Sequence, residues 1–257
     1  MHGRFAITFT AFSLFALGVA DAFIGFSGNR KFFSSLIALV LVFIAFFTFY
    51  FLPPKEIFSE RARKLVSLGL LIYFAGKAIE GYFAFVGNPL PCPSFADAFW
   101  IIAVFPIAYG IVRLGSVFSV ELTAARKAVI ALVSAAFLLL LVLIAFVPIA
   151  SSSAELAEKA VLILAVLFDW FLFTASAYLL AMLWRWHRLA EPIVLLTAGL
   201  AALAMYDAIF GRLAVDSEPP PATPWLYVLC VFGTFLFAMA AVRHKQVTEE
   251  MARDVAS

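Results

Sequence analysis

The chain has 257 residues, of which 65% are hydrophobic and 13% are charged, and its formal net charge is +2. Soluble domains are about half apolar and about one quarter charged, so this composition excludes an ordinary soluble protein. The mean hydropathy of +1.06 instead predicts an all-α integral membrane protein.

Eight apolar segments of about 20 residues, the length that spans a bilayer as an α-helix, follow one another along the chain. The predicted helices are Phe5–Phe26, Phe33–Leu52, Leu65–Val86, Phe95–Leu114, Ala128–Ala150, Ala160–Leu183, Ile193–Leu213 and Trp225–Val242. Few residues remain outside them, so residues 1–246 are predicted to form a single polytopic membrane domain. Residues 247–257 are predicted to be a short cytoplasmic tail that is solvated and frayed, although an extension of the last helix is the alternative.

The first predicted helix also resembles a signal peptide, because Arg4 and an apolar run precede Ala20-Asp21-Ala22, an A-x-A cleavage pattern. Cleavage would leave seven helices with the same orientation. The segment has full spanning length and a second helix follows at once, so we expect it to be retained.

Lysine and arginine gather on one side of the predicted membrane. Thirteen of the 18 lie in or beside the N-terminus, the 53–64, 115–127 and 184–191 loops and the tail, whereas only four lie on the opposite side. Because positively charged loops stay in the cytoplasm, both termini are predicted to be cytoplasmic in a multi-pass protein of the cell membrane. The sequence contains no basic stripe suited to nucleic acid.

The chain also suggests an internal repeat. When its second half is aligned with its first, a single shift pairs Glu80 with Asp207 and Phe105-Pro106 with Phe232-Gly233. Four helices in each half would make the repeat parallel, with halves at 1–120 and 121–246. Chance similarity between apolar helices is the alternative.

Ionisable residues inside the predicted helices indicate a functional site, because a charge at membrane depth costs several kcal/mol unless it is paired or hydrated. With a helix rise of about 1.5 Å per residue, most of them fall in the outer half of the membrane. There they are predicted to form one ligand-binding pocket that opens outward. Its expected members are Tyr73, Lys77, Glu80, Asp97, Asp207 and Asp21, and Asp169, nearer the midplane, is a candidate proton relay.

Lys77 and Glu80 also have a purely structural explanation. They are spaced i,i+3 on the helix face that carries Tyr73, so they would neutralise each other.

The four aspartates have structural explanations as well. Ser94 and Asp97 fit a capping box at the start of the fourth helix. Asp21 and Asp207 would be hydrated near the outer interface. Asp169 would accept a buried hydrogen bond.

Sequence motifs for catalysis and cofactor binding are mostly absent. There is no HExxH, GxSxG or phosphate loop, and His2, His187 and His244 lie at helix ends, so we expect no haem, metal or other cofactor. One enzymatic alternative is a dyad of Asp169 and Asp207 that shares a proton, which resembles intramembrane aspartyl proteases. The second helix lacks their Gly-x-Gly-Asp motif, so a non-enzymatic role is favoured.

The segment from Tyr73 to Leu114 carries a pattern of an acidic residue in one helix followed by Pro93-Ser94, Ala96-Asp97, Phe99-Trp100, Phe105-Pro106 and Gly110. It resembles the multi-helix N-terminal membrane domains of some bacterial diguanylate cyclases, phosphodiesterases and sensor histidine kinases. The region around Tyr206-Asp207 and Trp225 looks like the second half of the same domains. The resemblance implies a sensory input module. The sequence ends at Ser257 without an output domain, so we expect a stand-alone module that signals through a protein partner.

Three functions remain open from the sequence. The leading one is a sensor-like membrane protein in which binding of a small molecule, lipid or ion, or protonation, alters the Lys77–Glu80 pairing and the packing of the two halves. The second is a secondary transporter or proton-coupled carrier, with Asp169 continuing a polar route inward. The third is an accessory subunit of a larger membrane complex with a partner at its cytoplasmic face.

Overall fold

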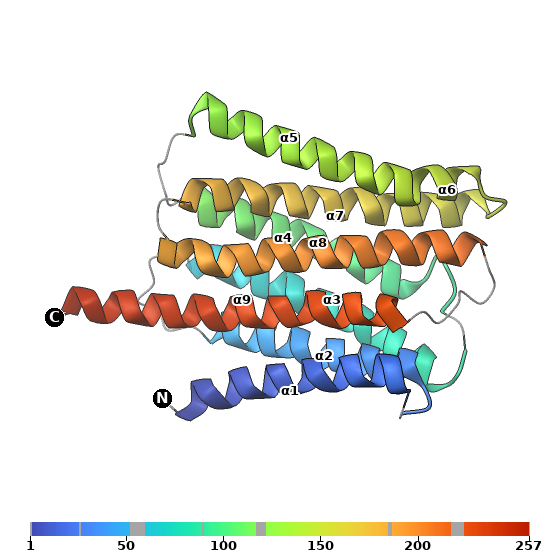
Figure 1. Cartoon of the computed structure of the whole chain (residues 1–257), viewed down its shortest axis with the longest axis horizontal. Helices are drawn as coiled ribbons and strands as arrows, with labels where there is room; N and C mark the ends of the chain where they lie inside the picture. Colours follow the sequence, from blue (N-terminus) through green and yellow to red (C-terminus); the bar gives the residue numbers. More distant parts are fainter. Residues whose placement is uncertain are drawn as a thin grey trace.

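The computed structural model describes residues 2–25, 27–51, 60–88, 90–116, 122–184, 187–216 and 224–256. Within these ranges the chain forms a bundle of roughly parallel helices and no strand (Figure 1). The helices are α1 (His2–Ile24), α2 (Arg30–Tyr50), α3 (Glu60–Phe85), α4 (Phe95–Ser116), α5 (Ala124–Leu141), the π-helical η1 (Val142–Phe146), α6 (Val147–Ser151), α7 (Leu156–Leu183), α8 (His187–Asp216) and α9 (Pro224–Ala256).

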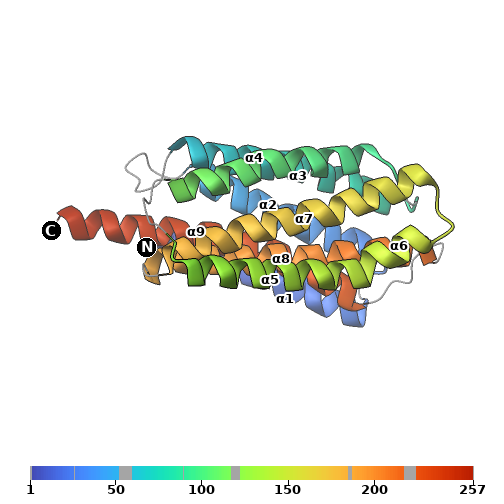
Figure 2. The ribbon, with the colours of Figure 1, turned by 90° about the horizontal axis from the view of Figure 1, so that it is seen from above.

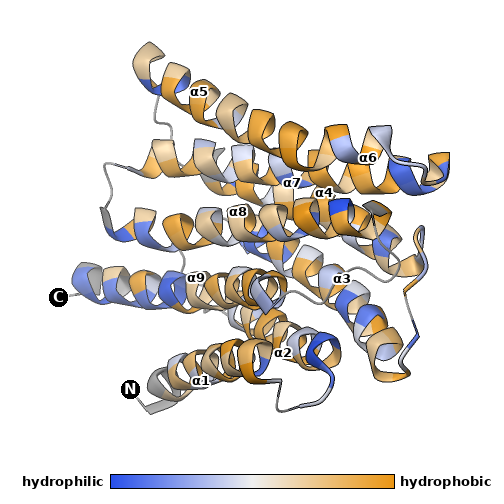
Figure 3. Cartoon of the chain, turned by 45° about the vertical axis from the view of Figure 1, so that its right-hand side comes forward, coloured by the Kyte–Doolittle hydropathy of each residue, from blue (hydrophilic) through white to orange (hydrophobic). Residues whose placement is uncertain are grey.

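Eight stretches of these helices are long and apolar enough to cross a membrane, with α5, η1 and α6 together forming one of them, Ala124–Ser151. This confirms the predicted all-α, multi-pass membrane fold. Apolar residues dominate the middles of the helices, and hydrophilic residues gather toward their ends (Figure 3). Large apolar side chains on the outer faces, such as Leu132 at 71% exposure, suit contact with lipid.

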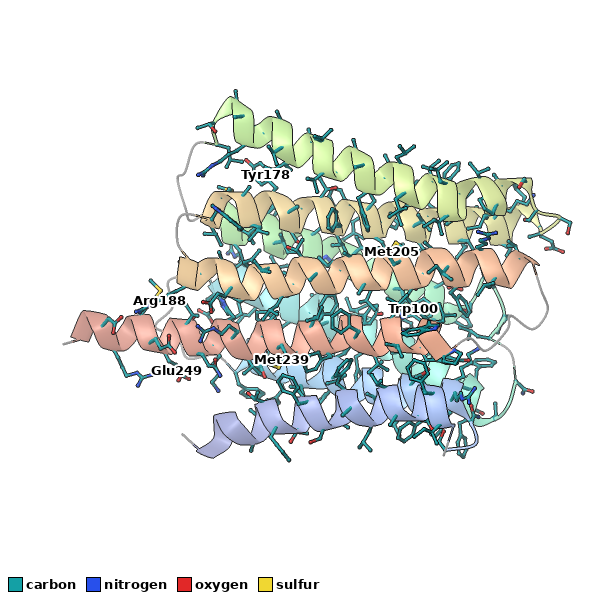
Figure 4. The ribbon with its side chains drawn as sticks, in the orientation of Figure 1. Trp100, Tyr178, Arg188, Met205, Met239 and Glu249 are labelled. Atoms are coloured by element: carbon teal, nitrogen blue, oxygen red, sulfur yellow. The ribbon has the colours of Figure 1, made fainter. Side chains whose placement is uncertain are left out.

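The two ends of the bundle differ in charge. α1 begins and α9 ends at the same end, so both termini lie on one side (Figure 1). That side also carries Arg61, Arg113, Lys127 and Arg243, and we call it the basic end. Figure 4 places Arg188 and Glu249 near the basic end and Trp100 toward the opposite end. Parts of the basic loops, including residues 52–59 and 185–186, lie outside the described residues.

α9 is longer than the sequence predicts. The predicted helix stops at Val242, where charged residues begin, but the structure continues it to Ala256. Val247 is fully buried and Thr248 is 2% exposed, so packing against the bundle carries the helix through its polar stretch. The expectation of a frayed tail is therefore wrong for residues 247–256.

Arg63 fixes the junction between α2 and α3 at the basic end. Its Nη1 atom donates hydrogen bonds to the carbonyl oxygens of Phe49, at 2.6 Å, and Tyr50, at 2.5 Å. These carbonyls belong to the last turn of α2, where no further turn of helix supplies donors. The ring of Phe49 also lies 5.6 Å from that of His244, so α9 joins the same junction.

The packing of the helices has a two-fold pattern. α3 packs on α4 as α8 packs on α9, α2 packs on α3 as α7 packs on α8, and α1 packs on α2 as α5 packs on α7. The halves meet through the α2–α9 and α4–α7 contacts, which correspond to each other in the two-fold pattern, and also through α1–α9, which departs from the pattern. α1 and α5 accordingly lie at opposite edges (Figure 1), while Figure 2 shows α3 and α4 along one face and α1, α5 and α8 along the other. The division of the chain into two parallel repeats stays a prediction.

Close backbone approaches define which residues of the two halves correspond. A Cβ atom at Gly69 would lie 2.9 Å from the Ala103 carbonyl oxygen, and one at Gly199 would lie 3.0 Å from that of Gly233. The same offset in residue number relates Gly69 to Gly199 and Ala103 to Gly233. This offset also relates Lys77 to Asp207. The sequence alignment instead pairs Glu80 with Asp207. An error of nearly one helical turn is expected when apolar helices are aligned by sequence, because it preserves the helix face.

Candidate ion cluster between the two halves

Lys77 and Glu80 on α3 form a buried ion pair. Lys77 Nζ lies 2.8 Å from Glu80 Oε2, and the two side chains are only 3% and 6% exposed. The i,i+3 spacing puts both on one helix face, as the sequence predicts. Each charge is balanced by the other, and removal of Lys77 would leave Glu80 as a buried carboxylate without its cation.

Three aromatic rings surround the Lys77 ammonium group. Nζ lies 5.9 Å from the ring centroid of Tyr73, 5.1 Å from that of Trp100 and 5.2 Å from that of Tyr206. These distances are within the range of about 6 Å over which a cation is attracted to a ring face. Gly76 permits the approach of α4, because a Cβ atom there would collide with the Trp100 indole.

A fourth helix reaches Lys77 through Cys230 on α9, whose Sγ atom lies 3.8 Å from Nζ. The ammonium group therefore contacts α3 and α4 of the first half and α8 and α9 of the second. Trp100 and Cys230 are themselves equivalent in the two halves, by the same shift that relates the glycine pairs. The cation thus stands where the two halves meet.

Asp169 on α7 and Asp207 on α8 lie within hydrogen-bond reach of each other. Both side chains are half-buried, and the Oδ2 atom of Asp169 is shielded from solvent without a hydrogen-bond donor among the described residues. Lys77 is close enough for its charge to act on both carboxyl groups. Asp169 and Asp207, which the sequence offers as an alternative carboxyl pair, therefore lie side by side. We call the whole group the Lys77 cluster: Tyr73, Lys77, Glu80, Trp100, Asp169, Tyr206, Asp207 and Cys230.

The Lys77 cluster is rich in negative charge. Three carboxyl groups lie within electrostatic range of one ammonium group, that of Glu80 in direct contact with it and those of Asp169 and Asp207 further away. The cluster reaches electrical neutrality when two of these carboxyl groups carry protons. Two carboxylates side by side in a low-dielectric setting do not both stay ionised, so such a pair shares a proton or recruits a cation. Chemically, the arrangement can take up and release protons.

Asp97 lies at the start of α4 in the predicted capping box. Its Oδ2 atom accepts hydrogen bonds from the backbone N–H of Ser94 at 2.6 Å and from Ser94 Oγ at 2.7 Å, and its own N–H donates to that Oγ atom at 3.3 Å. This reciprocal bonding satisfies donors at the helix start. The charge of Asp97 also acts on Asp207, so the cap borders the Lys77 cluster without joining its contacts.

Asp21 ends α1 and stabilises the turn that follows. Its carboxylate accepts hydrogen bonds from the N–H and the hydroxyl of Ser27, both at 2.8 Å, and the side chain is 1% exposed. These hydrogen bonds join Asp21 to Ser27 and not to any member of the Lys77 cluster. The structure thus brings together five of the seven predicted site residues, places Asp97 at the border and keeps Asp21 apart.

The Lys77 cluster is buried in part, and its members Tyr73, Trp100, Asp169 and Asp207 are half-buried, so the predicted outward opening of the pocket stays a prediction. Lys77 and Glu80 are buried, and Tyr206 is 6% exposed. Within the described ranges no three His, Cys, Asp or Glu side chains are arranged to hold a metal ion.

Sequence reasoning missed Trp100, Tyr206 and Cys230 as members of the cluster. Trp100 follows Asp97 at an i,i+3 spacing, so the helical period offered a signal for it. Cys230 carries no charge and lies in an apolar helix, where nothing local distinguishes it from lipid-facing residues, whereas Tyr206 is marked only by its neighbour Asp207.

Comparison of the chain with protein-family models, with curated proteins and with solved structures finds no match. The resemblance to bacterial sensory membrane domains therefore stays a prediction.

Proposed function

We propose that the protein is a sensor-like module of the cell membrane that responds to binding of protons at the Lys77 cluster. One observation carries the proposal: the shielded Asp169 Oδ2 atom lies beside Asp207 and has no hydrogen-bond donor among the described residues while both carboxyl groups are ionised. A proton on one carboxyl group supplies that donor.

The mechanism follows from the position of Lys77 between two sets of anions. When Asp169 and Asp207 hold protons, Glu80 is the partner of the ammonium group. When they lose protons, their charge competes with Glu80 for Lys77. The rings around Lys77 come from both halves of the bundle, so a shift of the ammonium group favours a different packing of the halves.

The first test measures thermal stability in lipid nanodiscs from mildly acidic to mildly alkaline pH. The shared proton belongs to the folded state, so stability should fall as pH rises, and Asp207→Asn or Asp169→Asn should flatten this dependence. Glu155→Gln is the matched control, because it removes an exposed carboxylate beside the start of α7. If thermal stability depends on pH in the same way in Asp207→Asn as in the wild type, the proposal is wrong.

A second readout follows the proton itself. The C=O stretch of a protonated carboxylic acid is resolved by infrared difference spectroscopy, and we expect such a band to vanish in Asp207→Asn and persist in Glu155→Gln. A wild-type spectrum without a protonated carboxyl band over the same pH range would contradict proton sharing.

We also propose that the protein is oriented in the membrane with its basic end in the cytoplasm. This orientation is supported by the lysines and arginines that gather there, following the positive-inside rule. Reporter domains fused to either terminus should be active only as cytoplasmic reporters. Activity of a periplasmic or extracellular reporter at either terminus would reverse the orientation.

A proton-coupled carrier is the second candidate, favoured by the position of Asp169. This residue lies nearly four turns after the start of α7, about 20 Å along the helix, so the carboxyl groups continue from Glu80 past Asp207 toward the midplane. In reconstituted liposomes a carrier should move protons and lose this activity in Asp169→Asn. Proton flux that is unchanged in that variant removes this candidate.

A further inference from the structure

A groove of about 390 Å³ runs between α5 and α7, away from the Lys77 cluster. Small residues of α5, Ala131 and Ala135, line one wall, and Trp170 and Tyr178 of α7 line the other. Tyr178 lies beside α5 in Figure 4. The volume is within the range of small-molecule sites, about 300–1,000 Å³.

The serine, threonine and tryptophan side chains that line the groove take part in hydrogen bonds within it. Ser134 Oγ lies 2.6 Å from Thr174 Oγ1, and Trp170 Nε1 donates to the carbonyl oxygen of Ser134 at 3.0 Å. These bonds leave a lining that is mostly carbon. An occupant of this part of the groove is therefore apolar, because a polar one would lose its hydrogen bonds to water.

The mouth of the groove is cationic. Lys127 lines it in the first turn of α5, at the basic end, and its side chain is exposed. Leu138 lines it three turns further along, about 16 Å deeper toward the membrane middle. An occupant thus has a negatively charged end at the membrane surface and an apolar body that follows the helix axis.

We infer that this groove binds an anionic phospholipid, with the phosphate-bearing headgroup at Lys127 and an acyl chain between α5 and α7. The charge of Lys127 is complementary to such a headgroup, and its position at the basic end matches the depth of headgroups in the bilayer. α5 contributes to the least buried of the candidate spans, so a lipid can reach the groove from the side. This inference does not depend on the proposed function.

The test is native mass spectrometry of protein released from nanodiscs that contain equal amounts of phosphatidylglycerol and phosphatidylcholine. We expect the wild type to retain phosphatidylglycerol about fivefold more often, the factor that corresponds to about 1 kcal/mol per basic residue near an anionic lipid. Lys127→Gln should remove this preference. Arg126→Gln is the control, because it removes the same charge from the same turn at a residue that does not line the groove.

A second pair of variants tests the acyl-chain slot. Ala135→Phe should fill the groove and reduce retention of both lipids, whereas Leu132→Phe, at a position 71% exposed on the same helix, should not. Equal retention of the two lipids by the wild type overturns the inference. So does an equal loss of preference in Lys127→Gln and Arg126→Gln, or undiminished retention in Ala135→Phe.

Discussion

Lys77 and Asp207 occupy equivalent positions in the two halves of the bundle. The equivalence comes from the pairs Gly69 with Gly199 and Ala103 with Gly233, which make the same close approach in each half and are related by the same shift. A cationic residue in one half therefore corresponds to an acidic residue in the other, and the two are close enough for the charge of Lys77 to act on Asp207. We therefore expect these charged residues to affect how the two halves pack against each other more than how stable each half is.

Replacement of Lys77 by Met should destabilise the protein strongly. Glu80 would then remain buried without its partner, which typically costs about 3–5 kcal/mol. The measurement is thermal unfolding in nanodiscs at neutral pH.

The double variant Lys77→Met/Glu80→Leu is the control for this prediction. It removes both charges and leaves apolar side chains of similar size, so it should recover most of the lost stability. A double variant no more stable than Lys77→Met would show that the aromatic contacts of Lys77, and not its charge pairing, dominate.

Introduction of a methyl group at Gly69 should loosen the contact between α3 and α4. A Cβ atom there would meet Ile107 and the Ala103 carbonyl oxygen, and overpacking of this kind costs about 1–3 kcal/mol. Gly199→Ala should behave in the same way between α8 and α9, because its Cβ atom would meet the Gly233 carbonyl oxygen and Phe237. Both effects are measurable as lowered unfolding temperatures.

Gly81→Ala provides a matched control on the same helix as Gly69. Its nearest neighbour would be the Ser35 Cβ atom at 3.9 Å, an ordinary contact. Alanine is a better helix former than glycine by about 1 kcal/mol, so this variant should be as stable as the wild type or more so. Equal destabilisation at positions 69 and 81 would refute the argument from close packing.

Loss of the cap at the start of α4 should have a modest effect. Ser94→Ala removes the hydroxyl that bonds to Asp97 and should cost about 1 kcal/mol. Asp97→Asn keeps an acceptor and should cost less than Asp97→Ala. If these two Asp97 variants are equally unstable, the cap is not what the carboxylate contributes.

The thiol of Cys92 should react slowly with alkylating reagents. Burial, followed by the negative charges of Asp97 and Glu158, raises the pKa of Cys92 to about 12. The thiolate is the reactive form, so its fraction at neutral pH falls about 1,000-fold relative to an ordinary cysteine, and the rate should keep rising with pH up to about 12.

The alkylation experiment uses a Cys230→Ala background, so that Cys92 is the single thiol. The same protein denatured in detergent is the control and should react at the ordinary rate. A labelling rate that levels off near the ordinary thiol pKa in the folded protein would contradict the burial effect.

The eight helices are predictable from the sequence because each is a long apolar run, and the pairing of Lys77 with Glu80 is predictable because the helical period puts both on one face. The sequence-based prediction misplaces the end of α9, since hydropathy falls at Arg243 while the packing of Val247 and Thr248 continues. A hydropathy pattern indicates which residues prefer lipid. It does not indicate the packing contacts that extend a helix past its lipid-facing part.

The geometry of the Lys77 cluster could not be predicted from the sequence, for a different reason. Which residues of α4, α7, α8 and α9 face Lys77 depends on the rotation of each helix about its axis. In a helix that is apolar all round, little in the sequence reports that rotation. Asp169 and Asp207 were identifiable as charges, but their contact with each other was one alternative among several.

The hydrogen bonds of Arg63 to the last carbonyls of α2 join α2 to α3 in addition to the peptide chain that links them. A guanidinium group on a residue that is 4% exposed holds the two helix ends together from the side of α3. The backbone could therefore be severed within residues 52–59, and two co-expressed fragments should reassemble in the bilayer. The basic end thus offers a natural place to divide this protein into complementing pieces.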